Sequence, residues 1–214
     1  MDRSEIPQLR QSLLAWWENH ARDFPWRKTK NPYNILIAEV LLHRTRADQV
    51  VPVYNGFISK YPTLKKLVTA SSDDVQNVLF PLGLRWRSNL LLEMASELDS
   101  KYNCKIPSDR EHLLQLPGIS EYIASALRCF SYGYSEPILD TNTVRIIGRL
   151  YGLNITDGSR RSKKFRQILE QLIPENNCDD FNFALLDLAA LVCKTSKPRC
   201  IDCPISVFCD YPKH

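Results

Sequence analysis

The sequence of 214 residues lacks the segments that mark an exported or membrane-spanning chain. Its start, MDRSEIPQLRQ, contains no apolar core of a signal peptide. The apolar stretch FNFALLDLAALVC is interrupted by Asp187, so we expect no segment to span a bilayer and no membrane partner. We therefore expect a cytoplasmic protein. Structural disulfides are rare in that compartment.

The sequence also has little that is typical of β-structure. It contains no convincing pair of alternating apolar and polar segments and no repeat of fixed period. Apolar residues instead recur at helical spacing. We expect helices in residues 6–24, 33–50, 71–80, 87–102, 110–116, 121–130, 143–152, 160–173 and 181–193. Ser71, Ser108 and Asp140 stand where N-caps are expected. The fold class predicted from this pattern is all-α.

Cysteine is concentrated near the end of the chain. Four of the seven cysteines fall within residues 193–209. They are Cys193, Cys200, Cys203 and Cys209. A disulfide framework does not suit a chain without an export signal, whereas four thiolates suit either a tetrahedral zinc ion or a 4Fe–4S cluster. Ligand softness does not separate these two metal sites. Lys197 and Arg199 lie in the same loop and are either solvated charges or contacts to phosphate.

A second feature is the segment LLQLPGISEYIASALRCF. A short helix is expected to end at Leu116, a tight turn to follow at Pro117 and Gly118, and a new helix to begin near Ser120. The free backbone N–H groups at the start of that helix favour an anion, so the hairpin can hold a DNA phosphate. A plain helical hairpin explains the same pattern.

Two carboxylates are candidates for chemistry. Asp140, in PILDTNTVRIIGRL, is either an ordinary N-cap or a carboxylate held near a cleft. Glu39 interrupts the apolar run NILIAEVLL, where a carboxylate is expensive unless it is paired or functional. A buried glutamate satisfied by an arginine or a backbone amide is the alternative. A functional one would suit a general acid.

Together these residues resemble the helix-hairpin-helix DNA glycosylases of the endonuclease III superfamily. The resemblance runs from DFPWRKTKNPYNILIAEVLLHRT to Cys209, and LPGIS followed by LDTNTVR is fairly specific. It implies two helical domains with a DNA-binding cleft between them: a helical barrel with the hairpin, residues 29–134, and an iron–sulfur cluster domain, residues 1–28 and 135–214. It also implies that the four cysteines hold a 4Fe–4S cluster.

The resemblance further implies roles for particular residues. Asp140 matches the catalytic carboxylate, while Asn142 and Glu39 match residues that assist it. Tyr122 stands where members that also cleave the backbone carry a nucleophilic lysine, which predicts a glycosylase without lyase activity. Leu84 resembles the family's wedge, and His43 and Arg44 are candidates for contact with the orphan guanine. Gly118 and Ser120 of the hairpin, and Lys197 and Arg199 of the cysteine loop, remain candidate phosphate contacts on the grounds given above.

The resemblance leaves two substrate classes open. The favoured one is thymine or uracil opposite guanine in double-stranded DNA, because His43 and Arg44 stand where adenine glycosylases have glutamine. The sequence also ends five residues after Cys209, before the additional domain that adenine glycosylases usually carry. The alternatives are an adenine glycosylase and a non-catalytic DNA-binding module. A monomer is expected in each case.

Ser120 and Glu121 depart from the usual glycine and basic residue of the hairpin, and Glu121 would repel a nearby phosphate.

Overall fold

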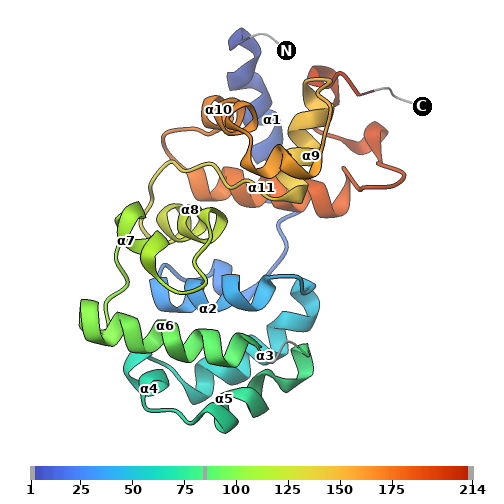
Figure 1. The fold of residues 1–214 in the computed structure, drawn as a ribbon. Helices are drawn as coiled ribbons and strands as arrows, with labels where there is room; N and C mark the ends of the chain where they lie inside the picture. Colours follow the sequence, from blue (N-terminus) through green and yellow to red (C-terminus); the bar gives the residue numbers. More distant parts are fainter. Residues whose placement is uncertain (1–2, 84–85, 212–214) are drawn as a thin grey trace. The chain divides into compact units, whose positions relative to one another are not determined.

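The computed structural model describes residues 3–83 and 86–211, and within these ranges every regular element is helical (Figure 1). The all-α prediction is confirmed. The chain forms two compact units: Asp23–Tyr132, here called the central unit, and Met1–Arg22 with Gly133–His214, here called the terminal unit. The boundaries expected from the sequence were at residues 28/29 and 134/135. No helix in the described ranges is both long and apolar enough to cross a membrane.

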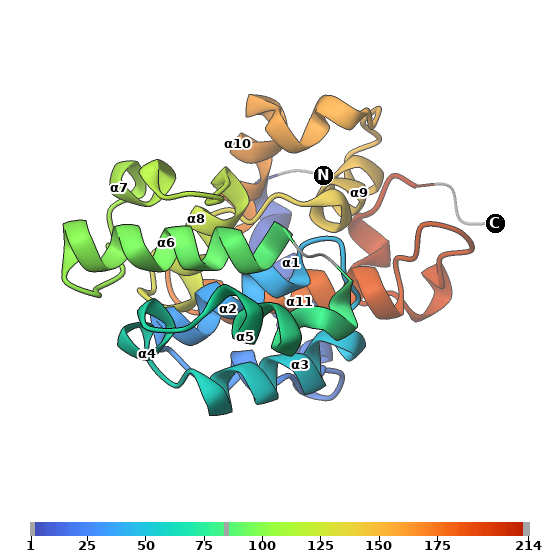
Figure 2. The same cartoon turned by 60° about the horizontal axis from the view of Figure 1, so that its bottom comes forward.

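The central unit is built around a buried helix, α2 (Pro32–Leu42). Its residues from Ile35 to Leu41 are all buried, which is typical of a helix enclosed by others rather than of an amphipathic surface helix. It packs against α3 (Ala47–Lys60) and α8 (Glu121–Phe130). The remaining helices of this unit are α4 (Leu64–Val68), α5 (Ser72–Leu79), α6 (Trp86–Tyr102) and α7 (Arg110–Gln115). Figure 2 shows α4 and α5 against α6.

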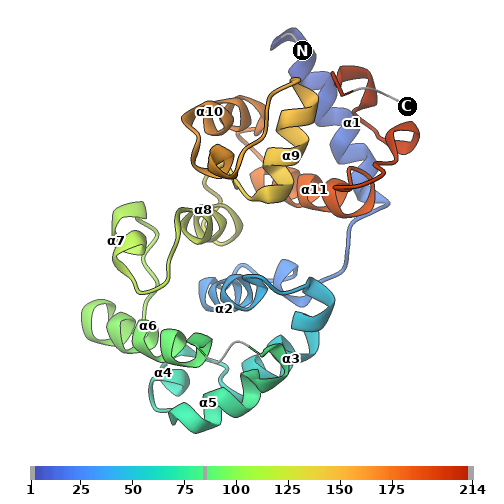
Figure 3. The same ribbon diagram turned by 45° about the vertical axis from the view of Figure 1, so that its right-hand side comes forward.

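The terminal unit joins both ends of the chain. Its helices are α1 (Ile6–Glu18), α9 (Thr141–Leu150), α10 (Lys163–Leu172) and α11 (Cys178–Leu191). The helix α11 packs against α1 and α9, and α10 packs against α9 (Figure 3). Short 3-10 turns occupy Asp157–Arg161, Cys200–Asp202 and Ser206–Phe208.

One buried carboxylate ties the first helix to the last in this unit. Asp187 of α11 is fully buried and accepts hydrogen bonds from Trp17 Nε1 at 2.9 Å and from the Arg22 backbone N–H at 3.0 Å. The Arg22 Nε donates to its other oxygen at 2.5 Å. The charge that interrupts the apolar stretch in the sequence is thus paired, as a buried charge must be.

Two local expectations from the sequence are wrong. The helix predicted over residues 33–50 breaks into α2 and α3, because residues 43–46 leave the helical conformation and Arg44 is left-handed with φ 59°. The N-cap predicted at Ser108 lies one residue later, where the Asp109 side chain accepts from the His112 backbone N–H at 3.0 Å.

Candidate active site and cysteine cluster

Asp140 begins helix α9 and is held by its own N-terminal turn. Its Oδ1 accepts the backbone N–H groups of Asn142 and Thr143, both at 2.8 Å. Its backbone N–H donates to Thr143 Oγ1 at 2.9 Å, which completes a capping box. The Asn142 side chain donates to the second oxygen, Oδ2, at 2.6 Å. The carboxylate therefore has one fixed orientation, and Asp140 is half-buried rather than enclosed.

Arg145 connects this carboxylate to the first cysteine of the loop. It lies one turn after Asn142 on α9, and its Nη2 donates to Asn142 Oδ1 at 3.2 Å. The same nitrogen donates to the Ala189 carbonyl at 3.1 Å, and Nε donates to the Cys193 carbonyl at 2.9 Å. The sequence analysis did not single out Arg145. The i, i+3 spacing from Asn142 was the signal that could have found it.

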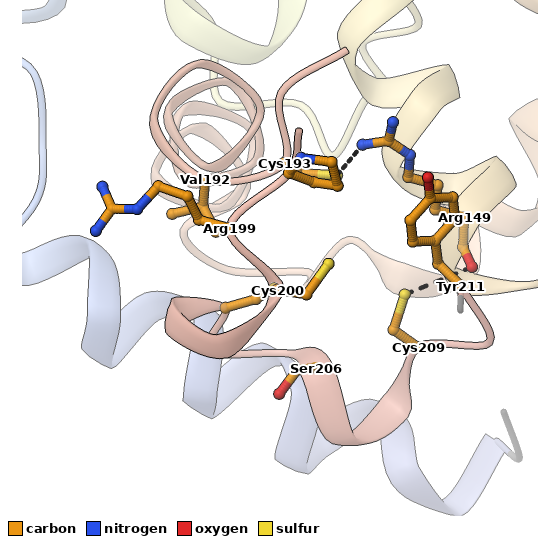
Figure 4. Close-up of a pocket in the computed structure, with 10 residues that line it drawn as sticks. Arg149, Val192, Cys193, Arg199, Cys200, Ser206, Cys209 and Tyr211 are labelled. Atoms are coloured by element: carbon orange, nitrogen blue, oxygen red, sulfur yellow. Dashed lines mark hydrogen bonds between the residues drawn. The ribbon is translucent and has the colours of Figure 1, made fainter. Parts of the chain in front are cut away.

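The four cysteines predicted as ligands line one cavity, which Figure 4 shows together with the arginine and tyrosine beside it. Arg149 Nη1 donates to Cys193 Sγ at 3.3 Å and to the Lys194 carbonyl at 2.7 Å. Its Nη2 donates to the Thr195 carbonyl at 2.9 Å, and its guanidinium lies 4.6 Å from the centre of the Tyr211 ring. Arg149 therefore fixes both a thiol and the backbone that follows it.

The donor set of this cavity consists of four cysteine thiols, which as thiolates are ligands for a metal ion or an iron–sulfur cluster. Among the described residues that line it, none is acidic. Burial raises the pKa of the Cys203 thiol to about 11, and burial also raises the pKa of Cys209. A positively charged ligand would reverse this and hold both as thiolates. No group of three or more His, Cys, Asp and Glu side chains in the described ranges is arranged to hold a single metal ion.

Lys197 and Arg199 lie on the outside of the same loop. Arg199 forms an ion pair with Asp202, with Nη2 and Nε at 2.7 and 2.8 Å from Oδ2, and its guanidinium points away from the cysteines in Figure 4. Lys197 is exposed and has a positive φ of 51°. The charge of Arg199 is therefore already paired with that of Asp202.

The hairpin predicted between α7 and α8 is present in the central unit. Gly118 has a φ of +74°, and a Cβ at this position would lie 2.6 Å from the side chain of Leu90. The positive φ favours glycine, and any larger residue would also have to displace the Leu90 side chain. Ser120 is the N-cap of α8 and accepts the Ile123 backbone N–H at 3.3 Å. Glu121 forms an ion pair with Arg110, so the charge that departs from the family pattern is offset within the unit.

The other predicted residues of the central unit lie on two helices that pack together and on the 43–46 loop. Glu39 of α2 is only 6% exposed, and Tyr122 of α8 is half-buried. His43 and Arg44 are exposed. Partial burial lowers the pKa of His43, and the nearby Arg44 and Arg87 lower it further. The predicted wedge Leu84 lies outside the described residues.

The fold and these sites define a helical DNA-repair protein with a helix-hairpin-helix. Residues 37–175 match the family model described as HhH-GPD superfamily base excision DNA repair protein, and the chain belongs to this family. The family predicted from the sequence is thereby confirmed.

The relatives that match this chain differ in how much of their own length the match covers. A thymine-DNA glycosylase of Aeropyrum pernix is 36% identical, over 99% of this chain and 97% of that protein. An adenine DNA glycosylase of Mycolicibacterium smegmatis is 34% identical, over 91% of this chain but only 66% of that protein. The solved structure of a thermostable thymine-DNA glycosylase superposes with a TM-score of 0.91 at 32% identity and covers 97% of this chain and 96% of that one.

Proposed function

We propose that the protein is a DNA glycosylase that hydrolyses the N-glycosidic bond of thymine or uracil paired with guanine in double-stranded DNA, without strand-cleaving lyase activity. The observation that carries this proposal is Asp140, a carboxylate fixed by three donors at the start of α9. The thymine-DNA glycosylase of Aeropyrum pernix is similar along 99% of this chain, and a solved thymine-DNA glycosylase superposes with a TM-score of 0.91. These likenesses support thymine or uracil over adenine as the excised base.

Breaking the bond between the sugar and the base develops positive charge on the sugar. An ionised Asp140 facing the anomeric carbon would stabilise that charge and orient the attacking water. Asn142 would keep the carboxylate in place through its hydrogen bond to Oδ2. Glu39 would protonate or hydrogen-bond the departing base as general acid.

The absence of lyase activity follows from the residue at position 122. A lyase step needs an amine that attacks the sugar and forms a Schiff base, and the phenol of Tyr122 cannot do so. Tyr122 would instead line the base pocket. Water remains as the nucleophile, and the product is an abasic site.

The substrate base must leave the duplex before it reaches these groups. Extrusion costs a few kcal/mol, and less at a mismatch, which gives some selectivity. We propose that Leu84 fills the gap and that His43 and Arg44 contact the guanine left behind, since arginine is a common partner of guanine edges. Phosphates would be held by the hairpin and the cysteine loop, at Gly118, Ser120, Lys197 and Arg199. We expect the protein to act as a monomer, in the cytoplasm or, in a eukaryote, in the nucleus.

We also propose that the cavity of the terminal unit holds a 4Fe–4S cluster. The ligands would be Cys193, Cys200, Cys203 and Cys209, which line one cavity without forming a site for a single ion. The spacing of these cysteines along the chain, and their position after the hairpin, support a cluster over zinc. When bound, the cluster would supply a rigid anchor for the loop rather than a reacting group. Arg149 would donate a hydrogen bond to the Cys193 thiolate, a contact that tunes such clusters.

The test is excision from a panel of duplexes that contain G·T, G·U, adenine opposite oxidised guanine, or A·G, scored as alkali-labile sites. We expect cleavage of G·T and G·U only. Asp140→Asn should abolish excision and keep binding to a G·T duplex, because asparagine still caps the helix. Asp109→Asn, at the N-cap of α7, is the matched control and should remain active. Excision of adenine would favour the adenine glycosylase instead. Binding without excision by the wild-type protein would favour the non-catalytic module.

A further inference from the structure

The 43–46 loop has an unfavourable backbone that something else must hold. It connects α2, which ends at Leu42, to α3, which begins at Ala47. Arg44 within it has a φ of 59°, in the left-handed region that side chains other than glycine seldom adopt. Such a conformation persists only where the surrounding structure fixes it.

Arg87 holds this loop from another helix, in addition to the backbone hydrogen bond from the Thr45 N–H to the Leu42 carbonyl at 3.1 Å. It lies in the first turn of α6 and is fully buried, with 0% of its surface exposed. Its Nη2 donates to the carbonyl of His43 and, at 2.7 Å, to Thr45 Oγ1. The two acceptors lie on either side of Arg44, so one guanidinium group spans the left-handed residue. Burial lowers the pKa of Arg87, but a guanidinium stays protonated at neutral pH.

Both His43 of the loop and Arg87 also contact the ring of Trp86, which lies at the surface. The His43 ring meets the Trp86 ring edge-on, with centroids 5.7 Å apart and an interplanar angle of 87°. The Arg87 guanidinium carbon lies 5.8 Å from the centre of the same indole. Trp86 is 46% exposed, and the side chains of His43 and Arg44 are exposed as well. The loop is therefore held through the His43 carbonyl and the Thr45 hydroxyl, while the side chains of His43 and Arg44 remain exposed to a ligand.

We propose that Arg87 is a positioning residue for base selectivity: it holds the 43–46 loop so that His43 and Arg44 meet the edge of the base opposite the excised one. This inference rests on the proposed function. The contacts of Arg87 described above end on the loop and on Trp86, and do not include Asp140, Asn142 or Glu39. Losing Arg87 should therefore change which opposite base is accepted more than it changes bond cleavage itself.

The experiment compares single-turnover excision of uracil opposite guanine, opposite adenine and opposite a tetrahydrofuran abasic analogue, which offers no base edge. In the wild-type protein we expect guanine to be strongly preferred. Arg87→Met should lower the ratio of the rates opposite guanine and adenine at least tenfold. The rate opposite the abasic analogue should stay within about threefold of wild type.

Two further variants separate positioning from folding. Thr45→Val keeps the shape of the side chain but removes one acceptor of Arg87, and should lower the guanine preference a few-fold with a smaller fall in melting temperature than Arg87→Met, because the His43 carbonyl still accepts from Arg87. Arg87→Lys keeps a charge and one donor, and should restore part of the preference. Thr69→Val, which removes an exposed hydroxyl that donates to the Lys66 carbonyl at 3.1 Å, is the matched control and should have no effect.

Each result decides one question. If Arg87→Met and Thr45→Val slow all three substrates equally, or leave the guanine preference intact, the positioning role is wrong. If Arg87→Met does not fold, Thr45→Val alone decides between these outcomes. A wild-type protein that excises neither uracil nor thymine contradicts the proposed function itself, and the inference falls with it.

Discussion

Replacing Arg145 by methionine tests whether the candidate catalytic carboxylate depends on a residue that does not touch it. Methionine keeps the length and the apolar stem of the side chain but removes all three donated hydrogen bonds. Two of these bonds end on the carbonyls of Ala189 and Cys193, and the third ends on Asn142 Oδ1. The substitution should therefore have two separate effects, one on stability and one on rate.

The effect on stability follows from the two carbonyls. A hydrogen bond to a charged group contributes about 1.5–3 kcal/mol, and two half-buried acceptors would lose their charged donor. We expect the free energy of unfolding to fall by about 3 kcal/mol. For a chain of this size, about 1 kcal/mol corresponds to a shift of about 2–4 °C, so the melting temperature should fall by about 6–12 °C.

The effect on rate follows from Asn142. Its amide donates to Asp140 Oδ2 at 2.6 Å while Arg145 holds the other end of the same amide. Without that anchor the side chain gains rotamer freedom, and a charge-assisted bond of about 1.5–3 kcal/mol is weakened in the transition state. Since about 1.4 kcal/mol is a tenfold change in rate, excision should slow by about 10- to 100-fold.

The assay is single-turnover excision from a G·U duplex with enzyme in excess, at a temperature well below the melting transition. Arg10→Met provides the matched control. Arg10 also donates three hydrogen bonds to backbone carbonyls, those of Gln171, Leu172 and Ile173, at 2.8–3.0 Å. It should lose similar stability without a change in rate, because these carbonyls lie at the end of α10 and do not contact Asp140.

The comparison between the two variants is decisive. If Arg145→Met and Arg10→Met lose the same stability and excise uracil at the same rate, Arg145 only holds the fold together. If Arg145→Met excises uracil more slowly than Arg10→Met, a substitution of Asn142 should slow excision in the same way. Asn142→Leu should reproduce the slower rate with a smaller loss of stability, and combining it with Arg145→Met should slow excision no further, since both act through one amide.

Three other substitutions test separate parts of the structure. Cys203→Ser should yield colourless protein with little bound iron, measured by absorbance and iron content, whereas full iron content would contradict the assigned ligand. Tyr122→Lys should add strand cleavage, detected as a protein–DNA adduct trapped by borohydride, and its absence would show that position 122 does not face the sugar. Gly118→Ala should lower the free energy of unfolding by more than about 1 kcal/mol in a urea titration, because its φ is +74° and the new methyl group would meet Leu90. Unchanged stability would mean that the hairpin relaxes freely.

Features encoded by short stretches of sequence were predictable. The N-cap at Asp140 and the turn at Gly118 each depend on residues within a few positions, and the structure contains both. The placement of Glu39 within an apolar helix was equally visible, since its neighbours along the chain are Ile35 and Leu36. Local physics is sufficient where a side chain interacts with its own helix.

Features set by distant residues were not predictable. The helix expected over residues 33–50 breaks where Arg87, from another helix, takes the carbonyl of His43 and the hydroxyl of Thr45. Nothing in the segment HRTRADQV signals that partner. The expected helix also stopped at residue 50, whereas α3 continues to Lys60 and buries Val53, Tyr54 and Phe57.

Helix α9 connects the candidate catalytic carboxylate to the cysteine loop within one unit. Arg145 and Arg149 lie four residues apart on this helix, so they share a face, and both reach the start of the loop. Arg145 binds the Cys193 carbonyl, and Arg149 binds the Cys193 thiol and the two carbonyls that follow. Any group that orders the loop therefore also orders α9. Because Asp140 takes its orientation from the first turn of that helix, we expect loss of the loop's order to reach the carboxylate through Arg145 and Asn142, with the hairpin of the central unit left intact.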